Sequence, residues 1–195
     1  MRYVSHAKAM TVNGNTWWVN ARKSGLFTHM AKRFISQVDA MLDHHNKIHL
    51  IRFDLHQPDY TPNNKHITDF NRRFHGRLKT KYQLTRIGFI CVRELEKSKK
   101  QHYHYVLILD GNKVQHPHHV LALVSEVWEH MDGFCYKPKN CYYNVERGNH
   151  SQLQRAIWRI SYLAKGRGKG YRPSQTKDYS TSRIKLNTNH RSTIN

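Results

Sequence analysis

Two histidines, His102 and His104, stand one residue apart at the start of an apolar run. Residues i and i+2 of a β-strand project from the same face, so both imidazoles would point the same way if this run is a strand. Imidazole is a common metal ligand, and two on one face can share an ion. With 16 histidines among 195 residues, such pairs also arise by chance, and a second pair flanks Pro117, which indicates a helix start instead. The first pair therefore predicts a metal site only if its neighbours supply further ligands.

Two carboxylates, Glu94 and Glu96, precede this pair and share a face of their own alternating segment. Residues 85–96 and 101–111 are typical of antiparallel strands joined by a turn at residues 97–100. Side chains opposite each other on such strands have Cβ atoms about 5 Å apart, so a carboxylate can join both imidazoles on one ion. This donor set leaves positions open on Mn²⁺ or Mg²⁺ for a phosphate oxygen, which suits Lewis-acid catalysis on a phosphodiester. The alternative, a surface pair of histidines at a sheet edge, fits the spacing equally well.

A tyrosine further along the chain is placed for chemistry by its position on a predicted helix. Residues 151–165 have helical periodicity, and at about 100° per residue Tyr162 falls nearly opposite the apolar stripe. Lys165, three residues on, is its neighbour on the helix surface. A phenol is a weak nucleophile until a nearby cation or metal stabilises the phenolate, and the same ammonium group can stabilise charge on a phosphate. The alternative is an amphipathic tyrosine on a basic surface that binds nucleic acid.

The charge of the chain points to a polyanionic partner. There are 33 Lys and Arg against 13 Asp and Glu, a formal net charge of +20, and nucleic acid is the partner that this excess favours. We find no apolar run of the roughly 20 residues that a transmembrane helix needs, no lysine-rich amphipathic helix, and no signal-peptide core at the N-terminus. Three cysteines form no even framework, which favours free thiols in a reducing compartment. We therefore expect a cytoplasmic protein that does not bind membranes.

The elements that would position these residues are a mixture of helices and strands. We expect one α+β domain in which helices flank a central antiparallel sheet. A polar N-terminal extension (1–23) would precede the domain (24–165), and a basic, flexible C-terminal arm (166–195) would follow it, with seven Lys or Arg and one acid. The expected helices begin near residues 24, 67, 117 and 151, and the expected strands are 16–19, 47–56, 85–96, 101–111 and 141–146.

Three short motifs together resemble those of a known superfamily. The run His-Tyr-His (102–104) before an apolar strand, and Tyr-Leu-Ala-Lys (162–165) on a later helix, resemble the HUH endonucleases. This superfamily includes rolling-circle replication initiators, relaxases and some transposases. With the later run Ser-Thr-Ser-Arg (180–183), the motifs resemble more narrowly the YagK/YfjJ-type proteins of prophages and inoviruses, over roughly residues 24–185. The resemblance implies an HUH/Rep-like (RRM-like) fold.

The resemblance also implies a role for each candidate residue. His102, His104 and Glu94 would hold Mn²⁺ or Mg²⁺, with Glu94 first among the carboxylates because it lies eight residues before the first histidine. Tyr162 would attack the scissile phosphate to give a 5′-phosphotyrosine and a free 3′-hydroxyl, with Lys165 assisting by charge. A serine precedes this tyrosine, so we expect a single-tyrosine enzyme in which a released 3′-hydroxyl or a second protomer completes strand transfer.

The implied activity is nicking and rejoining of single-stranded or hairpin DNA in a bacterial host cell, by the replication initiator of a phage or mobile element. A host helicase and a second copy of the chain are the expected protein partners. A non-catalytic DNA-binding regulator, which would form no covalent adduct, is one alternative. Another is an RNA-binding or RNA-processing protein, whose cleavage would survive EDTA and require the 2′-hydroxyl. The residues expected to contact nucleic acid are Arg155, Trp158, Arg159, Arg167, Lys169 and Arg172.

Overall fold

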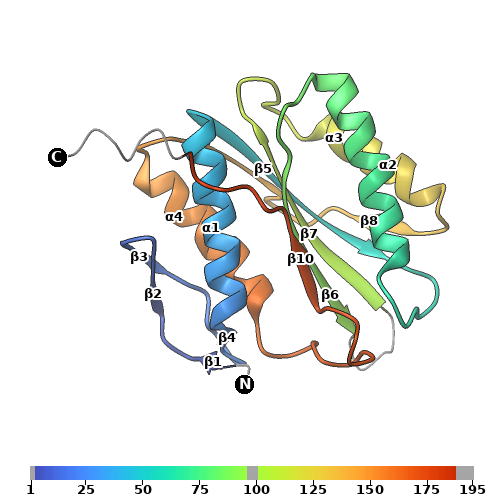
Figure 1. Ribbon diagram of the computed structural model, residues 1–195, viewed down its shortest axis with the longest axis horizontal. Helices are drawn as coiled ribbons and strands as arrows, with labels where there is room; N and C mark the ends of the chain where they lie inside the picture. Colours follow the sequence, from blue (N-terminus) through green and yellow to red (C-terminus); the bar gives the residue numbers. More distant parts are fainter. Residues whose placement is uncertain (1–2, 96–100, 188–195) are drawn as a thin grey trace.

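The computed structural model describes residues 3–95 and 101–187 of the chain. Its helices are α1 (Thr28–His44), α2 (Lys65–Tyr82), α3 (His118–Glu129) and α4 (His150–Ser161). The strands of the main sheet are β5 (Lys47–His56), β6 (Gly88–Leu95), β7 (Gln101–Asp110), β8 (Phe134–Tyr136), β9 (Tyr142–Glu146) and β10 (Tyr179–Thr181). All pair antiparallel in the order β10-β6-β7-β5-β8, and β9 pairs with β5 on the same edge as β8. The expected α+β fold with a central antiparallel sheet is confirmed (Figure 1).

Alternation along the central strand β7 gives the sheet two apolar faces. Val106 and Ile108 belong to the core beneath α1 and α4, whereas Tyr105 and Leu107 belong to the core beneath α2 and α3. Figure 1 shows these two helix pairs on opposite sides of the sheet. Because helices cover both faces, β7 is buried along almost its whole length. None of the helices in the described residues is long and apolar enough to cross a membrane.

The face beneath α1 and α4 changes from apolar to polar along the strands. On β7 the apolar pair Val106 and Ile108 is preceded on the same face by His104 and His102. On β6 the corresponding face ends on Glu94, which lies opposite His102 in the antiparallel register. The sheet therefore gathers the three candidate ligands at the polar end of this one face.

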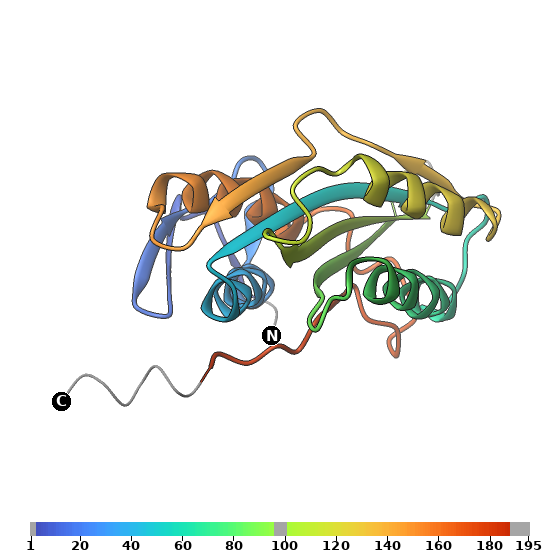
Figure 2. The ribbon, with the colours of Figure 1, turned by 90° about the horizontal axis from the view of Figure 1, so that it is seen from above.

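The N-terminal residues, expected to form an extension outside the domain, instead complete one side of its core. Strands β2 (Ala9–Val12) and β3 (Asn15–Trp18) form a hairpin, seen beside α1 and α4 in Figure 2. Trp17 of this hairpin is only 2% exposed and stacks on His150 of α4, with ring centroids 4.8 Å apart. Residues 1–23 are mostly polar, and only a few apolar side chains pack against the core. For this reason the overall composition did not predict the packing.

The segment after residue 166, expected to be a flexible arm outside the domain, is built into the sheet as far as residue 187. β10 pairs with β6, with Tyr179 opposite Val92 and Thr181 opposite Ile90. Figure 1 shows β10 running along β6 at the edge of the sheet. The segment also buries Lys169. Its partner strand is distant in the sequence, so no local pattern predicts the pairing.

The chain leaves α4 by a tighter turn than expected. A continuous helix to residue 165 was predicted, but the α-helix ends at Ser161 and Tyr162–Ala164 form a 3₁₀ turn. Lys165 then adopts an extended backbone conformation and bridges to β4 (Leu26–Phe27). The same short strand pairs with β1 (Val4–Ser5) at the start of α1. These contacts anchor the turn that carries the candidate tyrosine.

Candidate metal centre

Glu94, His102 and His104 converge at the polar end of the sheet face. One potential ligand atom from each residue lies within 4.8 Å of those from the other two. Oε2 of Glu94 is 3.2 Å from Nε2 of His104 and 4.0 Å from Nε2 of His102. The strand register explains the convergence, because Glu94 faces His102 directly and His104 is the next residue on the same face. The alternative carboxylate, Glu96, lies outside the described residues.

The donor set suits a divalent cation. Imidazole nitrogens and carboxylate oxygens bind such ions at about 2.0–2.2 Å, so atoms that share one ion lie about 3–4 Å apart. The distances from Glu94 to the two imidazoles, 3.2 and 4.0 Å, fall in this range. Asp54 lies behind His104, with its Oδ1 2.8 Å from Nδ1, which leaves Nε2 directed at Glu94. A carboxylate that fixes the second nitrogen of a ligating histidine commonly accompanies metal sites. Glu94, His102 and His104 can therefore hold a metal ion.

Two lysines form ion pairs with Glu94. Nζ of Lys169 is 2.7 Å from Oε1, and Nζ of Lys165 is 3.1 Å from Oε2. All three side chains are buried. Burial by itself raises the pKa of Glu94, but the His104 hydrogen bond and the two ammonium groups outweigh it and hold this pKa below its ordinary 4.5. The carboxylate is therefore ionised and able to bind a cation.

His104 lies between two carboxylates that favour its charged form. Burial acts to lower the pKa of His104, but the hydrogen bonds and charges of Asp54 and Glu94 raise it above 6.5. The pKa of Asp54 is in turn lowered from 3.8, because the hydrogen bond and charge of His104 outweigh the effect of burial. When both of its ring nitrogens carry a proton, His104 can donate to both carboxylates. A metal ion at Nε2 would replace one of these protons.

Lys169 reaches Glu94 because a glycine lets the backbone approach. Gly168 has φ +76°, in the left-handed region, and its carbonyl oxygen accepts a hydrogen bond from the N–H of Leu95. A Cβ at this position would lie 3.2 Å from Oε2 of Glu94, tighter than an ordinary contact. Because residue 168 is a glycine, the C-terminal segment can pack closely against the end of β6.

Tyr162 contacts Lys165, which in turn contacts Glu94 of this centre. Nζ of Lys165 is 4.8 Å from the centre of the Tyr162 ring and also contacts Glu94. The predicted neighbour relation of the two residues is therefore present, although a 3₁₀ turn rather than an α-helix forms it. Tyr162 is half-buried. It lines a cavity of about 210 Å³ together with Asn20, Arg22, Lys23, Ser24 and Arg167.

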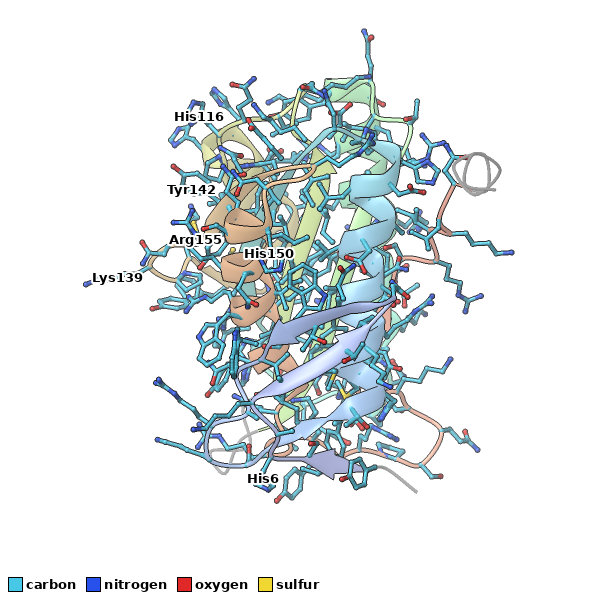
Figure 3. The ribbon with its side chains drawn as sticks, turned by 90° about the vertical axis from the view of Figure 1, so that its left-hand side faces the viewer. His6, His116, Lys139, Tyr142, His150 and Arg155 are labelled. Atoms are coloured by element: carbon cyan, nitrogen blue, oxygen red, sulfur yellow. The ribbon has the colours of Figure 1, made fainter. Side chains whose placement is uncertain are left out.

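The three predicted nucleic-acid contacts on α4 differ in their exposure and in their contacts. Arg155 is exposed on the outer side of the helix, on the face of the molecule that Figure 3 presents. Trp158 is half-buried, with the guanidinium carbon of Arg22 5.8 Å from its ring centre. Arg159 donates a hydrogen bond to the carbonyl oxygen of Lys139. Among these three side chains, Arg155 is the exposed one.

The three predicted contacts of the C-terminal segment differ from one another in environment. Arg167 is exposed. Lys169 lies inside the protein, where it also donates to the carbonyl oxygen of Lys165, so in this conformation it binds Glu94 instead of a phosphate. Arg172 pairs with Asp178, with Nε 2.6 Å from Oδ1.

An open cavity of about 690 Å³ adjoins the metal centre on the side of β8. His102 and Asp54 form part of its wall. Phe134 and Tyr136 also line it and are 62% and 49% exposed. In the strand register these two residues lie opposite His56 and Asp54, on the face that carries the centre. Exposed aromatic rings of this kind are surfaces on which nucleic-acid bases stack.

Sequence reasoning missed Asp54, Phe134 and Tyr136. Alternation along residues 47–56 places Asp54 on one face with His56, and this polar end of a strand was a usable signal. The two aromatic residues had no such signal, because only the pairing of β5 with β8 brings them to the centre.

One comparison with known proteins gives a match. The family model of the YagK/YfjJ C-terminal domain matches residues 8–180, which include the three candidate ligands and the turn that carries Tyr162. No curated protein and no solved structure matches the chain.

Proposed function

The chain belongs to the YagK/YfjJ C-terminal domain family, and from this premise we propose that it is a metal-dependent HUH-type enzyme that nicks and rejoins single-stranded DNA. The contact of Lys165 with both Glu94 and Tyr162 carries the proposal. It links a group that can hold a metal ion to a phenol that can act as a nucleophile. A purely structural metal site would require neither the tyrosine nor the open cavity beside His102.

Glu94, His102 and His104 would hold Mn²⁺ or Mg²⁺, and Asp54 would orient His104. The bound ion would polarise the scissile phosphate, since three protein ligands leave coordination positions open for phosphate oxygens. The ammonium group of Lys165 would add a positive charge beside the same phosphate.

Tyr162 is the proposed nucleophile. Its phenolic oxygen forms a bond to phosphorus while the bond from phosphorus to the 3′-oxygen breaks. The phenol releases its proton to solvent, and the 3′-oxygen takes up a proton to become a hydroxyl, leaving a 5′-phosphotyrosine. Attack by a 3′-hydroxyl reverses these changes, rejoins the strand and frees the tyrosine without an external energy source. Lys165, with its ammonium group over the ring, stabilises the phenolate.

The charge and the exposed aromatic rings support a single-stranded polynucleotide as the substrate. A net charge of +20 favours a polyanion. Phe134 and Tyr136 offer stacking surfaces beside the centre, and only unpaired bases present their faces to such rings. Initiation of phage or mobile-element replication is the biological role that we propose.

Denaturing gel electrophoresis tests the activity. The protein is incubated with Mn²⁺ and a mixed set of labelled single-stranded and hairpin oligonucleotides, with an EDTA control. Tyr162→Phe is compared with Tyr142→Phe, which removes the hydroxyl of an exposed tyrosine on β9. We expect a slowly migrating covalent band for the wild type and Tyr142→Phe, and no band for Tyr162→Phe or with EDTA.

Two other outcomes would contradict the proposal. Cleavage that survives EDTA and requires a 2′-hydroxyl would favour an RNA-processing protein. Oligonucleotide binding without any covalent band, together with no Mn²⁺ binding that depends on His102 and His104, would favour a non-catalytic DNA-binding regulator.

A further inference from the structure

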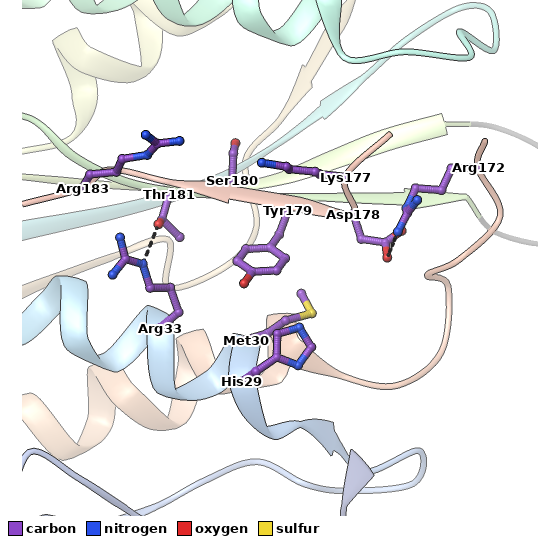
Figure 4. Close-up of a pocket in the computed structure, with 10 residues that line it drawn as sticks. All are labelled: His29, Met30, Arg33, Arg172, Lys177, Asp178, Tyr179, Ser180, Thr181 and Arg183. Carbon is purple, nitrogen blue, oxygen red and sulfur yellow. Dashed lines mark hydrogen bonds and ion pairs between the residues drawn. The ribbon is translucent and has the colours of Figure 1, made fainter. Parts of the chain in front are cut away.

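A third cavity, of about 380 Å³, lies between α1 and the edge strand β10 (Figure 4). Basic side chains from three separate segments line it. Arg33 comes from α1, Lys177 from the segment before β10, and Arg183 from the residues that follow this strand. In Figure 4, Arg33 extends from α1 toward Thr181, whereas Lys177 and Arg183 lie near the two ends of the strand, on its other side.

The positive charges of this cavity are not cancelled. Its one acidic lining residue, Asp178, pairs with Arg172 at 2.6 and 3.1 Å. Arg33, Lys177 and Arg183 have no carboxylate partner in the part of the chain that the structure describes, and all three are exposed. The cavity therefore presents about three uncompensated positive charges, an arrangement that attracts an anion.

Hydrogen-bond donors accompany these charges. Nε of Arg33 donates to the hydroxyl of Thr181 at 3.3 Å, and both residues line the cavity. Ser180 also lines the cavity, but in the strand register it lies opposite Cys91, on the other sheet face from Thr181. Guanidinium groups match the geometry of phosphate oxygens, so two arginines, a lysine and the hydroxyl group of Thr181 form a suitable set of partners for a phosphate.

The cavity and the metal centre lie on the same face of the sheet, on neighbouring strands. Tyr179 and Thr181 lie opposite Val92 and Ile90 and so share the sheet face of Glu94. Glu94 follows Val92 by two residues on β6, which is about 7 Å further along the strand. The aromatic cavity at β8 lies on the opposite side of the centre. Neighbouring strands are about 4.8 Å apart, so β8 and β10 are separated by about 19 Å.

We propose that the cavity between α1 and β10 binds a backbone phosphate of the DNA strand whose scissile phosphate lies at the metal centre. The inference rests on the proposed function. A strand that crosses the sheet would meet aromatic rings at β8, the metal centre on β6 and β7, and the basic cavity at β10. The bases are held on one side of the scissile bond and the backbone on the other, which fixes the position of that bond.

Fluorescence anisotropy with a labelled oligothymidylate tests the proposal. The cavity variant combines Arg33→Gln, Lys177→Gln and Arg183→Gln. The control variant combines Arg73→Gln, Lys79→Gln and Lys81→Gln on α2, which removes the same charge from exposed positions elsewhere. All measurements use a Tyr162→Phe background with EDTA, so binding is observed whether or not the protein nicks DNA.

We expect the cavity variant to bind at least tenfold more weakly than the control variant at low salt. The slope of log K against log salt should become less negative by about 0.7 for each phosphate that the variant no longer binds. The single variants Lys177→Gln and Arg183→Gln, at exposed side chains, should show severalfold weaker binding with unchanged melting temperatures. Equal affinities and slopes for the cavity and control variants would overturn the proposal.

Titration calorimetry with inorganic phosphate distinguishes a free anion from a DNA phosphate. We expect the wild type to bind oligothymidylate much more tightly than inorganic phosphate, and the cavity variant to bind both more weakly than the wild type. A variant that no longer binds inorganic phosphate but keeps its DNA affinity would show that the cavity takes a free anion, which would overturn the assignment to DNA.

Discussion

The ammonium group of Lys169 lies 2.7 Å from Oε1 of Glu94, and both side chains are completely buried. Lys169 belongs to the segment that follows the Tyr162 turn. Its ion pair with the carboxylate of the candidate metal centre therefore also holds this segment against the sheet. A metal ion and the ammonium group are two cations that act on one carboxylate. The free energy of metal binding and the stability of the closed segment are therefore linked.

Replacing Lys169 by Met should therefore have an effect that depends on metal. In EDTA the variant leaves Glu94 with one ammonium group fewer, and we expect the free energy of unfolding to fall by about 3 kcal/mol. With saturating Mn²⁺ this decrease should be at least halved, because the repulsion between the ion and the ammonium group is removed. Urea unfolding measures both values, with Lys185→Met, at an exposed lysine, as the control. An equal decrease with and without Mn²⁺ would refute the linkage.

The contact between Asp54 and His104 predicts a role in metal affinity. Asp54→Asn keeps the shape of the side chain but removes the charge that orients the imidazole. Loss of such a supporting carboxylate commonly weakens metal binding about 10- to 100-fold, and we expect the same for Mn²⁺ measured by calorimetry. Asp132→Asn is the matched control, because Asp132 lines the same cavity and is exposed. Unchanged affinity in Asp54→Asn would rule out this positioning role.

We expect the protein to lose stability in mild acid because of the buried imidazole of His75. Burial lowers its pKa from 6.5 to about 4, and its Nε2 lies 2.9 Å from the hydroxyl oxygen of Tyr105. The unfolded chain takes up this proton near pH 6.5 and the folded chain only near pH 4, so acidification favours unfolding. The stabilisation that His75 provides at neutral pH should fall by roughly 3 kcal/mol between these values.

His75→Gln, which keeps a donor for Tyr105, isolates this effect. Chemical denaturation at a series of pH values between 7.5 and 4 would compare it with the wild type. The variant should lose clearly less stability than the wild type over this range. Identical pH profiles for the two proteins would show that His75 does not carry the acid sensitivity.

The sequence was sufficient to predict the central pair of strands and the three candidate ligands. Alternation places His102 and His104 on one face, and the antiparallel pairing of the neighbouring strand puts Glu94 opposite His102. These relations are local, so periodicity and the short sequence separation of the two strands determine them. The lateral order of the strands is not local, and for this reason Asp54 on β5 and the two aromatic residues of β8 escaped prediction.

The polar ends of the chain were interpreted from composition, and composition was a poor guide. The segment after residue 166 is rich in charge and glycine, which is typical of a flexible arm. Its place in the fold depends on a few long-range contacts, among them the pairing of β10 with β6 and the burial of Lys169 against Glu94. Such contacts leave no periodic pattern in the sequence.

The most direct test of the account is the identification of the residue that becomes joined to DNA. Protein incubated with Mn²⁺ and single-stranded hairpin DNA would be treated with nuclease and trypsin and examined by peptide mass spectrometry. The account predicts a nucleotide attached through a 5′-phosphate to Tyr162, in the tryptic peptide of residues 160–165, and no attachment in EDTA. A nucleotide on any other residue, or cut DNA with no modified peptide, would contradict it.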